Sequence, residues 1–407
     1  MQRTITPMIY LALVLWIGLS PSISAQVPDS SFKKKVLTKL DVQTFFSLYE
    51  QQGQHSAVTG GAGDEQLSVY HTGLSLGYGM NEHLIIFKAS IDVISSPSTD
   101  NINFIKSSPS AHDNHIQAQL GYQYDIKPAR MQIGGAYLWS AESDYWSDGF
   151  QFWWNWTSKN KMSQLGLRLD AFWDDLRWGR FNEGENYSPS TLVYPVELRS
   201  TNWFNLYHRH SYNAAFSWIQ DINKRLRLQF NAGLMHQEGL LSTPFHRVYF
   251  RDTTSARVER LPQYRWRLPL TVAARWFVQP TLVVQPSYRF YCDNFGIIAQ
   301  TLQIQVALKP NRKISLYPFL RWYHQTASPY FAAYQQHWST ADFYTSDYDY
   351  SNFMVFKGGV GFGWLPDWRL GKRSKFYFNS ILLRYSFFYR TDGLSAHVLS
   401  LQFNLKK

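Results

Sequence analysis

Apolar and polar residues alternate along most of the chain, in segments of roughly ten to fourteen residues separated by turn-forming residues. Between Arg265 and Trp276 every second residue is apolar, starting at Trp266, and the opposite face carries Arg267 and Arg275. Such alternation is typical of a β-strand with one apolar and one polar face. The same pattern runs through residues 115–125, 164–174, 225–235 and 397–405.

The length of these segments separates two kinds of β-protein. Strands of soluble sandwiches usually run about five to six residues. A tilted strand that crosses a membrane needs about nine to eleven. The segments have the longer length, so the pattern predicts an all-β, antiparallel transmembrane β-barrel rather than a soluble sandwich.

Short and long connections also alternate along the chain, as short periplasmic turns and long external loops do in outer-membrane barrels. We expect about 16 strands (14–18), from residues 40–52 to residues 394–405, with both chain ends on the periplasmic side. Two connections depart from this rule. Those near Asn294 and Asp392 fall on the external side and are nevertheless short.

The N-terminus carries the features of an export signal. Arg3 precedes an apolar run from Met8 to Leu19, and small residues up to Ala25 suit cleavage before Gln26. The run is too short for a membrane-spanning helix, which needs about twenty residues. We therefore expect a signal peptide over residues 1–25, a short periplasmic segment over 26–39 and a single barrel over 40–407.

Composition adds to this picture. Aromatic residues make up 17% of the chain, and the interfacial girdles of a membrane barrel would accommodate them. The net charge is +11, but apart from Lys33–Lys35 the basic residues are dispersed, so we expect no nucleic-acid partner. The lone cysteine, Cys292, allows neither an internal disulfide nor a cysteine-rich metal site.

If the apolar faces meet lipid, the polar faces line the interior. Arginine predominates in the later strands, which favours small anionic solutes or an acidic partner. The alternative is structural, with the arginines paired to carboxylates and filling the barrel. The predicted lumen-lining residues are Lys88, Asp92, His115, Arg168, Asp170, Asp174, Arg225, Arg227, Arg265, Arg267, Arg275, Arg289, Arg321 and Arg384.

No motif convincingly indicates catalysis or a bound group. Gly73–Gly77 matches G-x-S-x-G, but it lies inside an alternating strand without the following helix that a nucleophile elbow requires. Gly358–Gly363 is glycine-rich without a phosphate-binding lysine after it, so close packing within a strand is the better interpretation. Acidic loop clusters, such as Asp100 with His112 and Asp113, lack calcium-loop spacing. We expect no catalytic, cofactor or metal site.

Several ordered stretches resemble the outer-membrane family catalogued as domain of unknown function 3570. They include 56–61, 92–102, 238–250, 258–262, 316–319, 325–331 and 344–349, and the resemblance covers about residues 40–407. It implies an outer-membrane barrel without an established activity. Genes of such families often neighbour flavin-transferase and lipoprotein genes, which suggests a redox or periplasmic flavoprotein context.

The family-like stretches lie mainly in the long external connections, where function is often found. His246, Arg247, Asp347 and Asp349 are therefore candidates for an ordered external mouth, although they could instead fold inward and brace the wall. Three functions follow as hypotheses. The first is a channel or conduit, the second a non-conducting scaffold for a periplasmic or lipoprotein partner, and the third an enzyme at the membrane surface.

Overall fold

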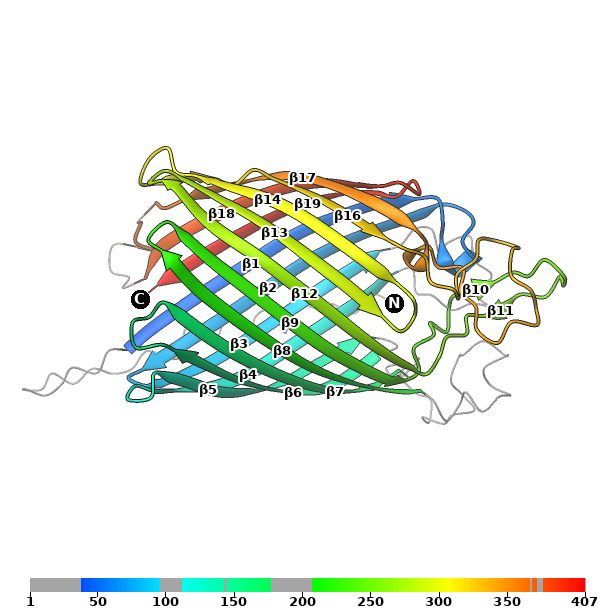
Figure 1. The fold of residues 1–407 in the computed structure, drawn as a ribbon, viewed down its shortest axis with the longest axis horizontal. Helices are drawn as coiled ribbons and strands as arrows, with labels where there is room; N and C mark the ends of the chain where they lie inside the picture. Colours follow the sequence, from blue (N-terminus) through cyan, green and yellow to red (C-terminus); the bar gives the residue numbers. More distant parts are fainter. Residues whose placement is uncertain are drawn as a thin grey trace, which may run out of the picture. The chain divides into compact units, whose positions relative to one another are not determined.

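The protein is a closed antiparallel β-barrel in which consecutive strands are neighbours (Figure 1). The structure, a computed structural model, describes residues 38–95, 112–142, 145–176, 207–366, 368–371 and 376–406. The predicted signal peptide, most of the segment 26–39 and Asp100 lie outside these ranges. Pairing of the first strand with the last closes the ring, from Asp41 opposite Lys406 to Gln52 opposite Ser395.

The strands have the length that the alternation predicts. They are β1 (Thr38–Gly53), β2 (Glu65–Met80), β3 (His83–Ser95), β4 (His112–Ile126), β5 (Met131–Glu142), β6 (Tyr145–Thr157), β7 (Ser163–Asp175), β8 (His208–Asn223), β9 (Leu226–Gly239), β12 (Tyr264–Gln279), β13 (Leu282–Asp293), β14 (Ile298–Leu308), β15 (Ile314–Leu316), β16 (Phe319–Gln325), β17 (Phe353–Trp364), β18 (Tyr377–Arg390) and β19 (Ser395–Lys406).

One strand of the barrel is divided into two segments. β15 and β16 both lie between β14 and β17, and Pro318 interrupts them because it has no amide hydrogen for the ladder. The 17 sheet segments in the described residues therefore form a barrel of 16 strands, which confirms the predicted fold class. A Cβ on Gly359 of β17 would lie 2.6 Å from the ring of Phe319, so this glycine gives the ring its space.

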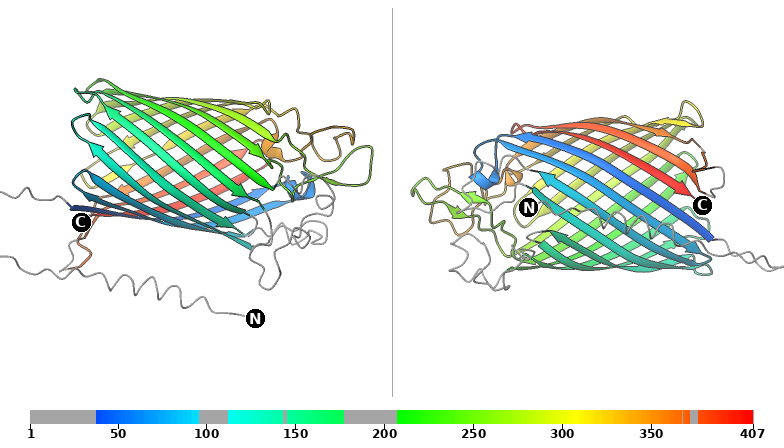
Figure 2. Two further views of the ribbon diagram at one scale, coloured as in Figure 1. Left: turned by 90° about the horizontal axis from the view of Figure 1, so that it is seen from below. Right: turned by 180° about the vertical axis from the view of Figure 1, so that it is seen from behind.

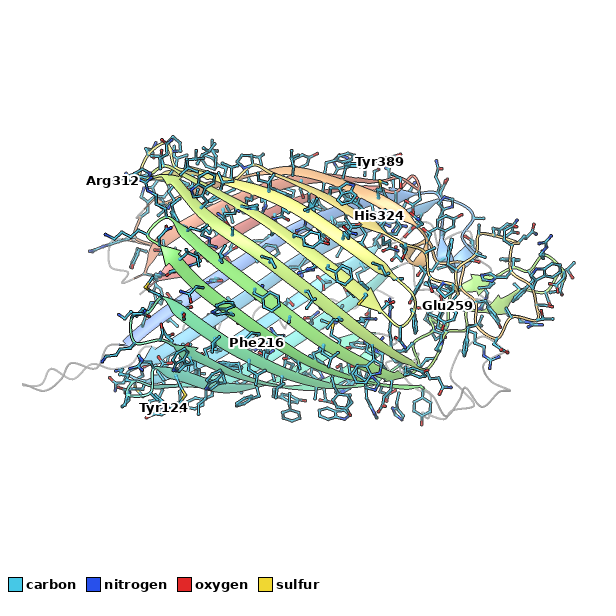
Figure 3. The ribbon with its side chains drawn as sticks, in the orientation of Figure 1. Tyr124, Phe216, Glu259, Arg312, His324 and Tyr389 are labelled. Carbon is cyan, nitrogen blue, oxygen red and sulfur yellow. The ribbon has the colours of Figure 1, made fainter. Side chains whose placement is uncertain are left out.

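The outer surface of the barrel is an apolar belt edged by aromatic rings. Exposed aliphatic side chains such as Leu120, Leu169 and Val272 cover its middle. Tyr124, Phe216 and Tyr389 project outward from the wall in Figure 3. This arrangement matches the lipid-facing band and interfacial girdles of membrane barrels. Exposed aromatic residues near the two edges of the belt include Tyr70, Trp173, Tyr212, Trp266, Tyr78, Tyr122, Trp218 and Trp276.

The two ends of the barrel differ. Short turns gather at the left end of Figure 1, where β1 begins and β19 ends, and long loops gather at the right end. Figure 2 shows the same division from two further sides. The strand predicted from Arg225 begins at Leu226, and Arg225 itself lies exposed in the turn before it. No helix in the described ranges is long and apolar enough to cross a membrane.

The long loops have a small core of their own. Val248, Phe250 and Tyr344 are buried together, with Ala341 packed against them. The short strands β10 (Arg247–Val248) and β11 (Arg257–Val258) pair within the connection 240–263. The two short external connections are covered by other parts of the chain: Phe295 packs against Tyr330 and Tyr350 of the loop 326–352, and Leu394 lies beside Gly53. A short connection is therefore compatible with the external side.

Candidate functional site

The register of the strands assigns each side chain to one face of the wall. In β3, Ile85, Phe87 and Val93 belong to the exposed apolar belt, so Lys88 and Asp92 lie on the opposite, inner face. Cross-strand pairs carry this assignment around the ring, because directly opposite residues share a face. Lys88 is opposite Gln119, for example, and Arg321 is opposite Lys357.

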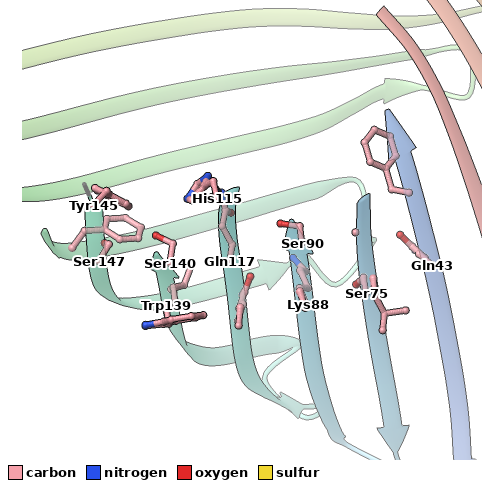
Figure 4. A pocket seen from close by; sticks show the side chains of 18 of the residues that line it. Gln43, Ser75, Lys88, Ser90, His115, Gln117, Trp139, Ser140, Tyr145 and Ser147 are labelled. Carbon is pink, nitrogen blue, oxygen red and sulfur yellow. Dashed lines mark hydrogen bonds between the residues drawn. The ribbon is translucent and has the colours of Figure 1, made fainter. Parts of the chain in front are cut away.

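The inner face of β1 to β7 is polar and mostly uncharged. It borders a cavity of about 590 Å³ whose lining includes Lys88 and His115 from the predicted set. Figure 4 shows these two side chains with Ser90 and Gln117 on neighbouring strands. Amide and hydroxyl groups predominate among the remaining polar residues, which are Gln43, Ser75, Gln119, Ser140, Tyr145, Ser147 and Gln402.

The predicted inward carboxylates of this side all have basic partners. Asp92 lies between two histidines, bonded to Nδ1 of His71 and 3.5 Å from Nδ1 of His115. Asp170 accepts a 2.9 Å hydrogen bond from Nε of Arg168. Asp174 accepts one of 2.7 Å from Nε of Arg209 and another from Ser147. Charge on this side is therefore largely compensated.

The inner face of β13 to β18 carries a cluster of positive charges, which we call the cationic wall: Arg289, Arg321, Lys357 and Arg384. None of the four forms an ion pair with any residue in the described ranges. Their hydrogen bonds go to uncharged groups instead. Nε of Arg289 donates to Thr271, Nε of Arg321 donates to Gln303 over 2.7 Å, and Arg384 donates to Gln305 over 2.7 Å.

The members of the cationic wall are close enough to repel one another. Arg321 interacts electrostatically with Arg289 and Arg384, and Lys357 interacts with Arg321 and Arg384. Arg289 and Arg321 are exposed although they face the interior, so water reaches them there. In the ring of 16 strands β5 lies across the lumen from β16, so the cationic wall faces the mostly uncharged inner face of β1 to β7.

The other predicted arginines have different surroundings. Arg227 forms a bidentate pair with Asp221 near the turn where Arg225 lies. Arg275 is opposite Arg227 in the register and is exposed. Arg265 and Arg267 lie at the external end, and Arg265 is buried against Asp293. The predicted set is thus divided between paired, buried and unpaired positions.

At the external end the loop 326–352 folds into the mouth of the barrel. Its single-turn helix η4 (Tyr348–Tyr350) is held by inner-face side chains. Gln325 donates from Nε2 to the carbonyls of Asp349 and Ser351, each over 2.8 Å. Arg390 bonds to the carboxylate of Asp349 and lies over the ring of Phe353. These contacts narrow the mouth on the side of β12 to β18.

Two loops bring a histidine and two carboxylates together beside η4. Nδ1 of His246 lies 3.6 Å from Oε1 of Glu259 and 3.8 Å from Oδ2 of Asp347. Glu259 is 1% exposed and accepts hydrogen bonds from the amide of Thr243 and the hydroxyl of Thr345. We call these three residues the mouth cluster.

Charge interactions within the mouth cluster displace its pKa values. Burial alone lowers the pKa of His246, but Glu259, Asp347 and Asp349 more than offset it and raise the value to about 9. Burial raises the pKa of Asp347 above its usual range, with Asp349 and Glu259 adding to the effect and His246 opposing it. The protonation states of His246 and Asp347 therefore depend strongly on the charged side chains around them.

Of the four residues predicted at the external mouth, the structure brings two into the mouth cluster, namely His246 and Asp347. Asp349 bonds to Arg390 instead. Arg247 is buried in β10 and donates to the carbonyl of Pro244. His112 and Asp113, named as a weak acidic cluster, lie in β4, and their side chains are outside the described set.

Sequence reasoning missed Lys357, Glu259, Asp293 and Arg390. Lys357 could have been found, because it continues the alternation of Met354, Phe356 and Gly358 on the opposite face. Glu259 lies in a connection where no periodicity assigns a direction to the side chain. Apart from residues of its own loop, the neighbours of Glu259 lie 86 or more positions away in the sequence.

The family described as "Protein of unknown function (DUF3570)" matches residues 85–380, from β3 into β18. No curated protein matches the chain.

Three solved structures illustrate the similarity in fold. Pseudomonas aeruginosa OpdK with vanillate has a TM-score of 0.41 at 8% identity, covering 91% of this chain and 99% of that one. A BenF-like porin from Pseudomonas fluorescens Pf-5 has a TM-score of 0.42 at 8% identity, with coverages of 93% and 100%. A bacterial polysaccharide outer membrane secretin has a TM-score of 0.44 at 8% identity, with coverages of 91% and 97%.

Proposed function

Because the chain belongs to the DUF3570 family, whose description assigns no activity, we propose a function from the barrel itself: an outer-membrane channel that passes small anionic solutes. The proposal includes export by a signal peptide over residues 1–25, a periplasmic segment over 26–39 and a barrel domain over 40–407. The apolar belt with aromatic edges supports the membrane location.

The observation that carries the proposal is the cationic wall. Four like charges on neighbouring inner-face positions repel one another, and the described residues supply no carboxylate to offset them. A purely structural role would favour pairing, as on the opposite side of the lumen. Unpaired arginine and lysine facing water instead concentrate anions from solution.

Ion selectivity tests this function directly. The folded protein, purified from membranes in detergent, is inserted in a planar bilayer under a KCl gradient, and the reversal potential gives the permeability ratio. We expect anion preference. The triple variant Arg289→Gln, Arg321→Gln, Arg384→Gln should lower the ratio of anion to cation permeability several-fold.

The matched control removes the same net charge outside the lumen. Lys161→Gln, Arg312→Gln and Lys313→Gln alter exposed residues of the short turns, and this triple variant should keep the selectivity of the parent. Equal effects of the two triple variants would contradict the proposal. A folded barrel that carries no current would contradict it as well.

A second candidate is a non-conducting scaffold for a periplasmic or lipoprotein partner. The packing of η4 into the mouth favours it, because that loop narrows the path through the barrel. The same bilayer experiment separates the two functions, since a scaffold gives no steady conductance. For an enzyme, a nucleophile would have to lie beside a histidine, and no serine of the described ranges hydrogen-bonds to His71 or His115.

A further inference from the structure

The mouth cluster has a donor set and spacing suited to a metal ion. One donor atom from each of His246, Glu259 and Asp347 lies within 4.8 Å of the other two. Ligands around a tetrahedral zinc ion at roughly 2.0–2.1 Å from the metal are separated by about 3.3 Å. The distances from Nδ1 of His246 to the two carboxylates are 3.6 and 3.8 Å, so a small inward movement of the side chains reaches that spacing.

Burial makes the cluster unlike an exposed acidic patch. Nδ1 of His246 has no accessible surface and no hydrogen-bond partner, and it points between the two carboxylates. Native proteins rarely leave a buried polar atom unpaired. Glu259 is 1% exposed, and its two hydrogen bonds leave lone pairs available for a ligand bond.

The charges of the cluster also favour a cation. Two carboxylates are held together in a low-dielectric setting, and no lysine or arginine of the described ranges forms an ion pair with either. Burying two carboxylates against a single basic partner, His246, is costly. Arg390 lies nearby, but its partners are Asp349 and Asp392. A divalent ion that displaces the proton of His246 into solvent would bring a second positive charge to the two carboxylates.

There is also room for entry and for water ligands. A polar cavity of about 150 Å³ borders His246 and Asp347 and is lined on its other sides by Glu65, Asp349 and Arg390. The side chains of His246 and Asp347 are each 20% exposed, so an ion can reach them from this cavity. A metal with three protein ligands and an open position fits such a setting.

We propose that His246, Glu259 and Asp347 bind one divalent transition-metal ion of the zinc class. One imidazole and two carboxylates match the nitrogen and oxygen ligands of such ions better than the all-oxygen shells of calcium or magnesium. The ion would join the connection 240–263 to the loop 326–352 and so fasten the loops over the mouth. The proposal does not depend on conduction by the barrel.

The test is metal binding by the folded full chain, purified without a histidine tag and stripped with a chelator. Titration with Zn²⁺ followed by calorimetry should show one saturable site per chain, and Ca²⁺ should bind much more weakly. His246→Gln and Asp347→Asn should each weaken Zn²⁺ binding by at least about tenfold, since loss of an outer-shell partner alone costs that much.

A matched control comes from a second histidine–glutamate group on the outer face. Glu238 lies 3.5 Å from both His210 and His236, and Glu238→Gln should leave Zn²⁺ binding unchanged. Loss of binding in Glu238→Gln with retention in His246→Gln would overturn the proposal. Absence of any saturable Zn²⁺ site in the folded protein would overturn it equally.

Protection of the loops provides a readout that does not require a variant. Trypsin sites at Arg251, Arg257 and Arg260 lie in the connection that the ion would fasten. Zn²⁺ should slow cleavage there in the parent protein and in Glu238→Gln, but not in Asp347→Asn. Equal cleavage rates with and without Zn²⁺ in the parent would show that no ion joins these loops.

Discussion

Arg265 and Asp293, on the neighbouring strands β12 and β13, form a buried ion pair at the external end of the barrel. Nε of Arg265 donates to Oδ2 of Asp293 over 2.9 Å, and the aspartate side chain is 0% exposed. Tyr291 and the amide of Ile297 also donate to this carboxylate. The pair thus connects the wall to the short connection that follows β13.

Asp293→Asn should destabilise the barrel strongly. It leaves the buried guanidinium of Arg265 without its counter-charge, and breaking a buried pair on one side costs about 3–5 kcal/mol. Urea unfolding of the detergent-folded protein measures the change. Asp221→Asn breaks the more exposed pair with Arg227 and should cost less than about 1 kcal/mol. Similar losses for the two variants would contradict this prediction.

Gly359→Ala should destabilise the protein through overpacking. A Cβ there would lie 2.5 Å from the carbonyl oxygen of Tyr385 and 2.6 Å from the ring of Phe319. Forced contacts of this kind cost about 1–3 kcal/mol. Gly358→Ala in the same strand is the control, because its nearest neighbour is a Leu320 side chain atom at 3.4 Å. Thermal unfolding should separate the two, and equal midpoints would exclude the packing explanation.

Stability of the external loops should fall on acidification below about pH 6.5. Burial lowers the pKa of His337 from 6.5, and its Nε2 bonds to the carbonyl of Thr345 over 2.8 Å. The unfolded loop therefore takes up a proton first, so the contribution is intact above pH 6.5 and is lost as pH falls toward the lower folded value. Tryptic cleavage after Arg257, followed from pH 7.5 to 5.5, measures it. His337→Gln should flatten the dependence, and an unchanged profile would assign it to another group.

Gln325→Ala should enlarge the conductance of the proposed channel. The substitution removes both hydrogen bonds that hold the backbone of η4 in the mouth. Without Gln325, the carbonyls of Asp349 and Ser351 would hydrogen-bond to water instead. The loop that carries η4 should then move out of the mouth of the barrel more often. Single-channel recording in a bilayer gives the measurement. Gln303→Ala, which changes an inner-face amide bonded to Arg321, should leave the open-channel size nearly unaltered. No difference between these variants would show that η4 does not limit the current.

The sequence predicted the wall of the barrel well because strand periodicity is local. The alternation around Arg265 and Trp276 assigned both faces of β12 without knowledge of any partner strand. Strand length then distinguished a membrane barrel from a sandwich. Arg225 lies one residue before β9, in a turn, so the alternation does not assign its side chain to a face of the wall.

The arrangement of side chains at the external mouth could not be predicted, because it depends on contacts between residues far apart in the sequence. His246, Glu259 and Asp347 meet through loops whose course no periodicity describes. Likewise, the sequence pattern placed arginines on the inner face but could not separate Arg321, which has an amide partner, from Arg265, which has a buried carboxylate. Pairing depends on cross-strand neighbours, and therefore on the register.

Pairing of β1 with β19 makes closure of the wall depend on strands from the two ends of the described chain. Until Ser395–Lys406 has been delivered, two strands expose unpaired backbone groups, which lipid does not tolerate. A polypeptide that stops before β19 therefore cannot become a shorter barrel by closing on itself with the same register. Closure of the barrel therefore requires β19, the strand Ser395–Lys406, as well as all the strands before it.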